Sequence, residues 1–274
     1  MSRSVELGDR LGEGRTAEVY AVADDSTRAV KLYERGADDA VVDREATYSR
    51  VAVAAGVAAP EVFGTVDVDG RRGIVLERVD GPHLADRMRE RPWAVVEAAR
   101  TAAGVHRRMH DCDGGDLPSL GERLRRRVEA GAIGVRQREG TLTVLDALPA
   151  GDALCHGDFH PENVLLRDGE PVVIDWVDAA AGHPAADVAR SSLLLRLAVA
   201  DDDYGPFRAG YFRGLVETYR RTYLRSYLDG AGFDRELVER YELPVAAARL
   251  TEGVPSGEER RLRDRIGDLL DRYG

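Results

Sequence analysis

Short segments in which apolar and polar residues alternate dominate residues 1–79 of the chain. Such segments are typical of β-strands, and here they end at glycines or at turns such as Asp24-Asp25-Ser26. We predict strands at residues 5–11, 18–23, 28–33, 62–68 and 72–78. Apolar positions at helical spacing predict one helix, over residues 39–55. The first part of the chain is therefore expected to be a β-sheet with a single helix.

The run Asp80-Gly81-Pro82 breaks this pattern, and the chain becomes mainly helical after it. Apolar residues about one helical turn apart predict a helix over residues 92–110, and residues 184–274 read as helical throughout. Between these regions we predict an island of short strands, at residues 154–156, 164–166 and 172–174. We place the main domain boundary at residues 80–82.

Composition indicates a globular protein without a membrane span. The 274 residues are 43% hydrophobic, which suffices for a core and is too apolar for a disordered chain. The longest uncharged stretch, residues 51–60, is far shorter than the roughly 20 residues that a spanning helix needs. No apolar run follows the first residues, so we expect no signal peptide.

Cysteine content and net charge indicate the cellular location and the classes of partner. Two cysteines, Cys112 and Cys155, cannot form a disulfide framework, which favours a cytoplasmic location. The formal net charge of −10 is poorly matched to a phosphate backbone. We therefore expect a cytoplasmic protein that binds neither nucleic acid nor membranes, with its oligomeric state open.

One lysine stands out in a chain rich in arginine. Of the 39 basic residues, 38 are arginines and one is Lys31. A GC-rich genome or a salt-adapted host favours arginine wherever the exchange is tolerated, so a remaining lysine is expected where a planar guanidinium cannot replace a compact ammonium group. Chance alone can also leave one lysine anywhere, so this observation only nominates Lys31.

A glycine-containing loop, Leu11-Gly12-Glu13-Gly14, connects the first two predicted strands. Glycines let a backbone approach a polyphosphate closely and point its N–H groups at it. No Gly-Lys-Ser/Thr follows and no helix begins after the loop, which excludes a Walker loop and a dinucleotide-binding turn. By itself, Gly12 with Gly14 is also compatible with an ordinary hairpin turn.

Lys31 lies near the end of the third predicted strand, and Glu45 lies on the helix that follows. A strand lysine oriented by a helical glutamate is how kinase-like folds hold the α- and β-phosphates of ATP. The alternative is a surface lysine and a solvated glutamate. The glycine loop and the single lysine favour the functional interpretation.

The most specific signal spans residues 155–166 and 173–176. Its order is a strand, a polar loop, a hairpin and a polar residue after the hairpin, which predicts that Asp158, Asn163 and Asp175 meet at one edge of a small sheet. Hard oxygen ligands such as Asn163 and Asp175 suit Mg²⁺. Asp158 is suited to accept a hydroxyl proton and to direct the oxygen at a γ-phosphate.

The same part of the sequence allows a second interpretation, a transition-metal site of a metallohydrolase. His156, Asp158 and His160 alternate, so on a continuous strand they would share one face. Gly157 and Pro161 break a strand, however, and no second His/Asp cluster in the sequence supplies further ligands. We disfavour this interpretation.

These motifs together resemble the aminoglycoside phosphotransferase/choline kinase family, small-molecule kinases with the protein-kinase fold. The resemblance runs from Leu11 to about Ser192. It implies an α+β, two-lobed fold with an N-lobe of antiparallel sheet plus one helix at 1–79. The C-lobe would be mainly helical, with catalytic hairpins in its core at 80–192 and a C-terminal helical part at 193–274 that shapes the acceptor site.

The resemblance also implies roles. Lys31, positioned by Glu45, would hold the ATP phosphates under the Gly12/Gly14 loop. Glu77, Arg78 and Val79 would form the hinge that meets adenine. Asp158 would be the catalytic base, Asn163 and Asp175 would hold Mg²⁺, and Asp187 would brace the catalytic loop. The implied activity is ATP- and Mg²⁺-dependent phosphorylation of a hydroxyl on an aminoglycoside, sugar or amino alcohol.

Departures from the family pattern leave some questions open. Gly157 replaces the arginine of the protein-kinase His-Arg-Asp loop, and no Ala-Pro-Glu segment follows Asp175, which argues against a regulated protein kinase. A protein Ser/Thr kinase-like enzyme and a non-catalytic nucleotide-binding regulator remain alternatives. The acidic run Asp201-Asp202-Asp203 fits either a cationic acceptor or, more simply, a solvated helix start. The acceptor, and ATP against GTP, stay undetermined.

Overall fold

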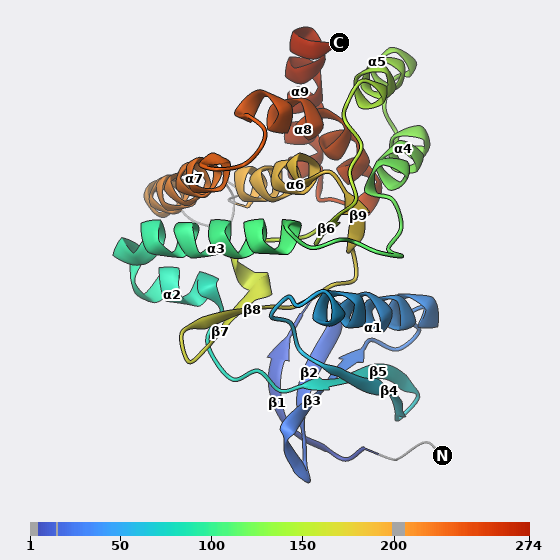
Figure 1. Ribbon diagram of the computed structural model, residues 1–274, viewed down its shortest axis with the longest axis vertical. Helices are drawn as coiled ribbons and strands as arrows, with labels where there is room; N and C mark the ends of the chain where they lie inside the picture. The colour runs from blue at the N-terminus through green and yellow to red at the C-terminus, as the bar shows by residue number, and fades with distance from the viewer. Residues whose placement is uncertain (1–4, 15, 199–205) are drawn as a thin grey trace. The chain divides into compact units, whose positions relative to one another are not determined.

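The computed structural model describes residues 5–14, 16–198 and 206–274 of the chain (Figure 1). Spatial contacts divide the chain into two compact units. The first unit is Met1–His83 with Asn163–Asp178, and the second is Leu84–Glu162 with Ala179–Gly274. The contacts thus group the hairpin within 163–178 with the N-terminal sheet, whereas the sequence division counts it with residues 80–192.

The first unit is built on a five-stranded antiparallel sheet with the strand order β1-β2-β3-β5-β4. Its strands are β1 (Leu7–Glu13), β2 (Ala17–Val22), β3 (Asp25–Tyr33), β4 (Val62–Val68) and β5 (Arg71–Glu77), and its helix is α1 (Asp39–Ala54). Helix α1 packs against β4 and β5 (Figure 1). The five strands and the helix that the sequence predicts are confirmed, with ends displaced by a few residues.

Side chains of β3 alternate between the two faces of the sheet, and each face contributes to a different apolar cluster. Val30 and Leu32 are buried in a cluster on one face with Val22, Val66 and Val75. Tyr33 points to the other face and packs with Val42 and Ala46 of α1. Because side chains alternate along a strand, Lys31 lies on the same face as Tyr33. The central strand therefore presents Lys31 beneath α1.

A two-stranded hairpin, β7 (Val164–Arg167) with β8 (Glu170–Val173), completes the first unit. Two backbone hydrogen bonds attach it to the linkers of the sheet: the N–H of Leu166 donates to the carbonyl of Pro82 at 3.0 Å, and that of Val173 donates to the carbonyl of Ala58 at 2.8 Å. Gly81 has φ +148°, and a Cβ there would lie 2.1 Å from the carbonyl oxygen of Leu166. Only glycine permits this approach.

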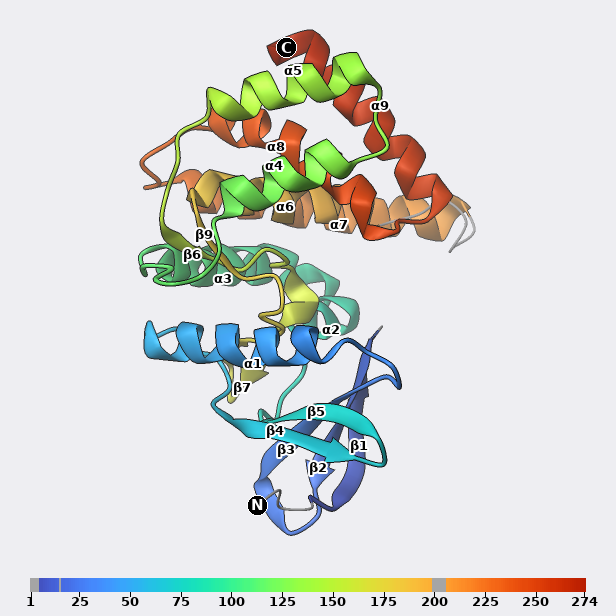
Figure 2. The ribbon, with the colours of Figure 1, turned by 90° about the vertical axis from the view of Figure 1, so that its right-hand side faces the viewer.

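The second unit is mainly helical, as predicted, and also has the short antiparallel pair β6 (Ala153–Cys155) and β9 (Ala180–Gly182). Its helices are α2 (Leu84–Glu90), α3 (Val95–His110), α4 (Leu120–Ala130), α5 (Val135–Asp146), α6 (Pro184–Leu197), α7 (Pro206–Leu228), α8 (Arg235–Arg249) and α9 (Ser256–Tyr273). Helix α3 packs along α7, and α8 packs against α4, α5, α6 and α9 (Figure 2). Three-residue 3₁₀ turns occur at Pro92–Ala94, Pro161–Asn163 and Leu250–Glu252.

Helices α3 and α7 supply much of the core of this unit. The apolar side of α3 is buried, including His106, which is fully inaccessible. Tyr219 and Tyr223 of α7 are buried, whereas Tyr211 on the same helix is 55% exposed. The Asp201-Asp202-Asp203 run lies outside the described residues.

Two further findings concern membranes and disulfides. Across the described ranges, every helix is too short or too polar to cross a bilayer. The two cysteines, both described, are not joined by a disulfide.

Candidate active site

The ammonium group of Lys31 is the centre of a three-membered charge cluster in the first unit. Its Nζ lies 2.7 and 2.9 Å from the two carboxylate oxygens of Glu45 on α1, and 3.0 Å from Oδ1 of Asp175 after β8. The predicted Lys31–Glu45 ion pair is confirmed. Sequence spacing did not predict the contact with Asp175, although both residues were candidates.

Because the cluster is largely buried, each of its charges depends on the others for stabilisation. The side chains of Lys31 and Glu45 are 15% and 3% exposed, whereas that of Asp175 is 38% exposed. Burial alone would lower the pKa of Lys31, but the charges of Glu45 and Asp175 outweigh it and raise that pKa above its ordinary value. Lys31 is therefore a permanent cation, and its removal would leave the Glu45 carboxylate buried without its counter-ion.

Tyr33 is a further member of the cluster that sequence reasoning missed. Its buried hydroxyl donates a short hydrogen bond to Oε2 of Glu45. Burial, followed by the charge of Glu45, raises the pKa of this phenol, so it stays a neutral donor. A signal was present, because Tyr33 follows Lys31 by two positions on a strand and must share its face.

Asn163 and Asp175 lie at the same end of the β7–β8 hairpin. Val164 pairs with Val173, and the N–H of Ile174 donates to the carbonyl of Asn163 at 3.0 Å, which brings the two flanking residues together. Asp175 has φ +67°, in the left-handed region that a non-glycine residue enters at some cost. The strained conformation indicates that the direction of this carboxylate is fixed by its surroundings.

The donor set at this hairpin end fits Mg²⁺. Oδ1 of Asp175 contacts Lys31, while Oδ2 has no hydrogen bond or ion pair within the part of the chain that the structure describes. Asn163 supplies an amide, the other hard oxygen ligand of the predicted pair. A partly exposed carboxylate and an amide at the same hairpin end suit a cation that also keeps waters and phosphates.

The glycine loop is a hairpin turn between β1 and β2, closed by the N–H of Gly14 donating to the carbonyl of Ala17 at 2.8 Å. Gly12 pairs with Val19 next to an irregularity in the β1–β2 register. A Cβ at Gly12 would meet no atom within 4 Å, and its φ is not positive. Neither backbone conformation nor packing within the described chain therefore requires glycine at position 12.

The predicted hinge, at the end of β5 and just after it, differs from residue to residue in how its backbone N–H groups are paired. The N–H groups of Glu77 and Arg78 donate to the carbonyls of Glu61 and Thr27, each at 2.8 Å. The N–H of Val79 has no partner among the described residues. Val79 therefore keeps a backbone donor available for a ligand.

Asp158 lies in the loop after β6, in the second unit, and its position relative to Asn163 and Asp175 stays a prediction. Its Oδ1 is 3.4 Å from Nη2 of Arg190 on α6, and its Oδ2 is 3.5 Å from Nε2 of His160. Burial would raise the pKa of Asp158, but His160 and the Arg190 charge lower it below its ordinary range. The carboxylate is thus held ionised.

Asp187 fixes the loop that carries Asp158. Its carboxylate accepts hydrogen bonds from the backbone N–H of His156 at 2.6 Å and from that of Gly157 at 2.8 Å. The predicted bracing of the loop by Asp187 is confirmed. Strand β6 ends at Cys155, so His156, Asp158 and His160 lie beyond it and do not share one face of a strand. The metallohydrolase interpretation requires such a shared face.

Two histidines of α3 complete the surroundings of Asp187. Nε2 of His106 and Nε2 of His110 lie 3.0 and 3.2 Å from its Oδ2. Their Nδ1 atoms lie 2.6 and 2.7 Å from the hydroxyls of Tyr223 and Tyr227 on α7. The sequence shows the two histidines one helical turn apart, but these contacts also depend on how α3 packs against α7, which helical spacing does not specify.

The His106, His110 and Asp187 cluster has the composition of a metal site, but its hydrogen bonds explain it without a metal. Burial, then the neighbouring His110, lowers the pKa of His106 to about 3, so its ring is neutral. A neutral imidazole can donate from Nε2 to Asp187 and accept from Tyr223 at Nδ1. Each ring nitrogen therefore has a partner, and the cluster carries no metal assignment.

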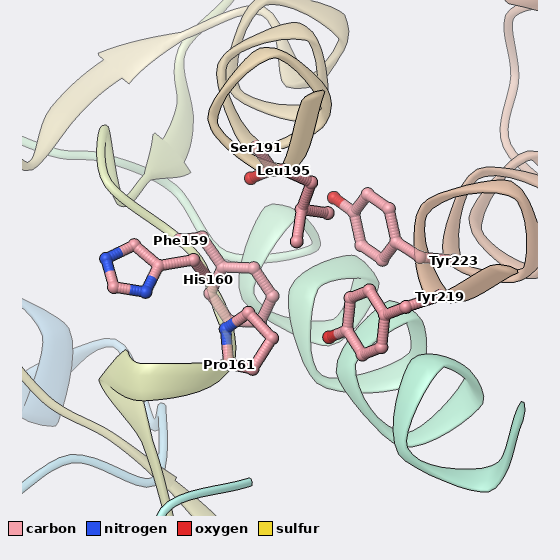
Figure 3. Close-up of a pocket in the computed structure, with 7 residues that line it drawn as sticks. All are labelled: Phe159, His160, Pro161, Ser191, Leu195, Tyr219 and Tyr223. Carbon is pink, nitrogen blue, oxygen red and sulfur yellow. The ribbon is translucent and has the colours of Figure 1, made fainter. Parts of the chain in front are cut away.

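A small hollow of about 150 Å³ lies beside the Asp158 loop (Figure 3). It is lined by Phe159, His160, Pro161, Ser191, Leu195, Tyr219 and Tyr223. The ring of His160 points away from the other lining residues, and the hydroxyl of Tyr219 points toward Pro161 (Figure 3). The space between these side chains does not admit even a water-sized molecule, so the hollow does not hold an acceptor by itself.

Comparison with known proteins places this geometry in a family. The profile of the phosphotransferase enzyme family matches residues 8–256. A curated protein of Yarrowia lipolytica, the EKC/KEOPS complex subunit BUD32, is 29% identical over 140 residues, which cover 51% of this chain and 49% of the relative. The chain thus matches about half the length of that relative.

Solved structures share the fold at low identity. An aminoglycoside-3'-phosphotransferase of type VIII has a TM-score of 0.59 at 21% identity, over 89% of this chain and 93% of that one. A choline/ethanolamine kinase family protein from Mesorhizobium loti has a TM-score of 0.59 at 20% identity, with 95% and 86% covered.

A third solved structure adds bound molecules. An aminoglycoside phosphotransferase from Streptomyces rimosus, in complex with ADP and streptomycin, has a TM-score of 0.53 at 19% identity, with 88% and 93% covered. The resemblance and the kinase-like α+β fold that the sequence predicts are confirmed.

Proposed function

Because the chain belongs to the phosphotransferase enzyme family, we propose that it transfers the γ-phosphate of ATP, with Mg²⁺, to a hydroxyl of a small molecule such as an aminoglycoside, sugar or amino alcohol. The observation that carries the proposal is the buried Lys31 cation, paired with Glu45 and Asp175 in the unit that also holds the glycine loop. Such a cation, next to a carboxylate with an available oxygen, suits a metal-bound polyphosphate. The nucleotide and streptomycin in the complexes of similar proteins are consistent with these ligands.

The first unit would bind the nucleotide. Lys31 would contact the α- and β-phosphates, with Glu45 and Tyr33 fixing its ammonium group. The backbone of the Gly12/Gly14 turn would lie over the phosphates, because none of the described residues fills the space at Gly12. The hinge backbone at Glu77 and Val79 would meet adenine, with the N–H of Val79 as donor.

Asn163 and Asp175 would hold Mg²⁺, which when bound neutralises charge on the transferring phosphoryl group. Asp175 would then connect the metal to Lys31, since its Oδ1 contacts the ammonium and its Oδ2 remains available. The strained φ of Asp175 would aim the carboxylate before the nucleotide arrives. Positioning of this kind is the main contribution that a protein makes to phosphoryl transfer.

Asp158 would accept the proton of the acceptor hydroxyl. The hydroxyl oxygen then forms its bond to the γ-phosphorus, the bond from that phosphorus to the oxygen of ADP breaks, and the proton moves to Asp158. The lowered pKa of Asp158 keeps this base ionised at neutral pH. Asp187 would hold the loop through the N–H groups of His156 and Gly157.

The proposal also assigns a role to each of the three predicted parts of the chain. Residues 1–79 would form the nucleotide lobe, 80–192 the catalytic core, and 193–274 part of the acceptor region. Cysteine usage supports a cytoplasmic location.

The test is ADP release from MgATP with pooled acceptors: aminoglycosides, sugars, amino alcohols and nucleosides. We expect one pool to stimulate release, and Asp158→Asn to abolish the stimulation. A peptide pool that exceeds every small-molecule pool would replace the proposal with a protein kinase. MgATP binding without ADP release for any acceptor would favour a regulator, and absence of MgATP binding would overturn the nucleotide assignment.

A further inference from the structure

Arg190 connects Asp158 to a carboxylate from the far end of the chain. Its Nη2 lies 3.4 Å from Oδ1 of Asp158 and 2.8 Å from Oε2 of Glu252. Arg190 is on α6, and Glu252 is in the 3₁₀ turn between α8 and α9. The Arg190 side chain is only 10% exposed and that of Glu252 only 16%. All three residues belong to the second unit.

Glu252 is held firmly enough to act as an anchor. Besides Arg190, it accepts from Nη1 of Arg127 on α4 at 2.8 Å, and from Nη1 of Arg249 at the end of α8. Arg249 is itself fixed by Glu258 at 2.9 Å. Burial would raise the pKa of Glu252, but the arginines lower it, so the carboxylate stays charged. The anchor thus ties α4, α6 and α8 together.

The two distances differ in a way that suits a general base. The guanidinium of Arg190 is closer to Glu252 than to Asp158, so its main partner is the anchor. A tight bidentate pair with Asp158 would occupy the lone pairs that an acceptor hydroxyl needs. A cation held at 3.4 Å stabilises the ionised base without making such a tight double contact.

We infer that Arg190 and Glu252 are positioning residues of the phosphoryl-transfer reaction: Glu252 holds Arg190, and Arg190 orients the Asp158 carboxylate. This inference rests on the proposed role of Asp158 as the base. It assigns a task to the C-terminal region, which the motifs of the sequence do not reach. The competing explanation is an ion pair that only holds α6 against the 3₁₀ turn.

A double-mutant cycle separates the two explanations. The rate of ADP release from MgATP is measured with the acceptor that the pools identify and, in parallel, with water as acceptor. The variants are Arg190→Gln and Asp158→Asn, alone and combined. Arg190→Gln is expected to fold, because Glu252 keeps Arg127 and Arg249 as partners. Arg190→Lys, which keeps the charge, serves as the rescue variant.

If Arg190 acts through Asp158, Arg190→Gln lowers kcat by about 10-fold or more and leaves the KM for MgATP unchanged, as expected when only orientation is lost. In the Asp158→Asn background the same change has no further effect, because the two losses are not additive. Arg190→Lys recovers part of kcat. Glu252→Gln lowers kcat in the wild-type background but not in the Arg190→Gln background.

A matched control is the ion pair between Arg265 of α9 and Glu242 of α8, at 2.8 Å with Glu242 only 2% exposed. It also joins two elements of the second unit, and its residues have no contact with Asp158 in the described chain. Arg265→Gln is expected to lower the free energy of unfolding without changing kcat.

The possible failures are distinguishable. If Asp158→Asn leaves kcat unchanged, or if ADP release is absent with every acceptor including water, the proposed function fails and the inference with it. If Asp158→Asn removes turnover while Arg190→Gln leaves kcat unchanged, the inference alone is wrong. Additive losses in the cycle, or a kcat that Arg190→Lys does not recover, would likewise reduce the Arg190–Glu252 pair to a structural contact.

Discussion

The Lys31 cluster and the Asp158 cluster solve opposite electrostatic problems. In the first unit a buried cation is stabilised by carboxylates from α1 and from the end of β8. In the second unit a partly buried carboxylate is stabilised by a cation from α6, which is itself anchored on Glu252. In both clusters the charged form is favoured over the neutral one, against the effect of burial.

The difference lies in where the partners come from. Lys31 and Glu45 are 14 residues apart on adjacent elements, so their pairing follows from one strand and the helix after it. Arg190 and Glu252 are 62 residues apart and meet only because α6 packs against α8. We expect the first cluster to govern nucleotide binding and the second to govern turnover.

The largest expected effect is that of Asp158→Asn on turnover. Loss of a general base costs about 10²- to 10⁴-fold in kcat, whereas MgATP affinity, which we assign to the first unit, should stay within a few-fold. Initial rates of ADP release and nucleotide titration calorimetry would measure the two quantities. A parallel loss of both would remove the distinction between the clusters.

The next effect is that of Lys31→Met on stability. It leaves Glu45 buried without its counter-ion, and breaking a buried pair in this way costs about 3–5 kcal/mol. Lys31→Arg keeps the charge, but the planar guanidinium of arginine does not match the compact contact that the ammonium group makes with Glu45 and Asp175. We expect Lys31→Arg to retain more of the stability than Lys31→Met, and to lose MgATP binding.

Denaturant unfolding and MgATP titration would test both Lys31 variants. Arg72→Met is the matched control, because Arg72 pairs at 2.6 Å with Asp43, which is 55% exposed, and such surface pairs contribute little. Normal activity of Lys31→Arg would show that the single lysine of the chain is accidental.

Sequence reasoning succeeded where the chemistry is local. The strands, α1, the Lys31–Glu45 pair and the hairpin bearing Asn163 and Asp175 follow from short-range spacing. It did not find Arg190 or Glu252, because in a chain with 38 arginines no single arginine is conspicuous. The same holds for Arg127 of α4, which contacts Glu252. Such partners are decided by helix packing, which periodicity does not specify.

A smaller effect is expected from pH, and it probes the support of the Asp158 loop. The pKa of His106 is lowered to about 3 in the folded protein, against about 6.5 in an unfolded chain. Between these values the unfolded state binds the extra proton, so the free energy of unfolding falls as pH decreases, by up to about 1.4 kcal/mol per pH unit. Below about pH 4 the lowered pKa of Asp187 adds a loss of the same sign.

Denaturant unfolding at a series of pH values, followed by circular dichroism, would measure this slope. In His106→Gln the amide can still donate to Asp187 but does not titrate, so the slope between pH 6.5 and 4 should become shallower. An unchanged slope would mean that His106 is not the group responsible.

The smallest effect on stability, and the sharpest test of the nucleotide loop, is that of Gly12→Ala. A Cβ at this position meets no atom of the described residues within 4 Å and requires no change of φ, so the free energy of unfolding should change by less than about 1 kcal/mol. A polyphosphate lying against the loop would meet the added methyl group, and the KM for MgATP should rise several-fold with little change in kcat. Gly81→Ala is the opposite control, because the carbonyl of Leu166 would lie 2.1 Å from its Cβ, and that variant should lose stability. If Gly12→Ala changes neither stability nor the KM, the glycine loop is an ordinary hairpin turn, and nucleotide binding in the first unit rests on the Lys31 cluster alone.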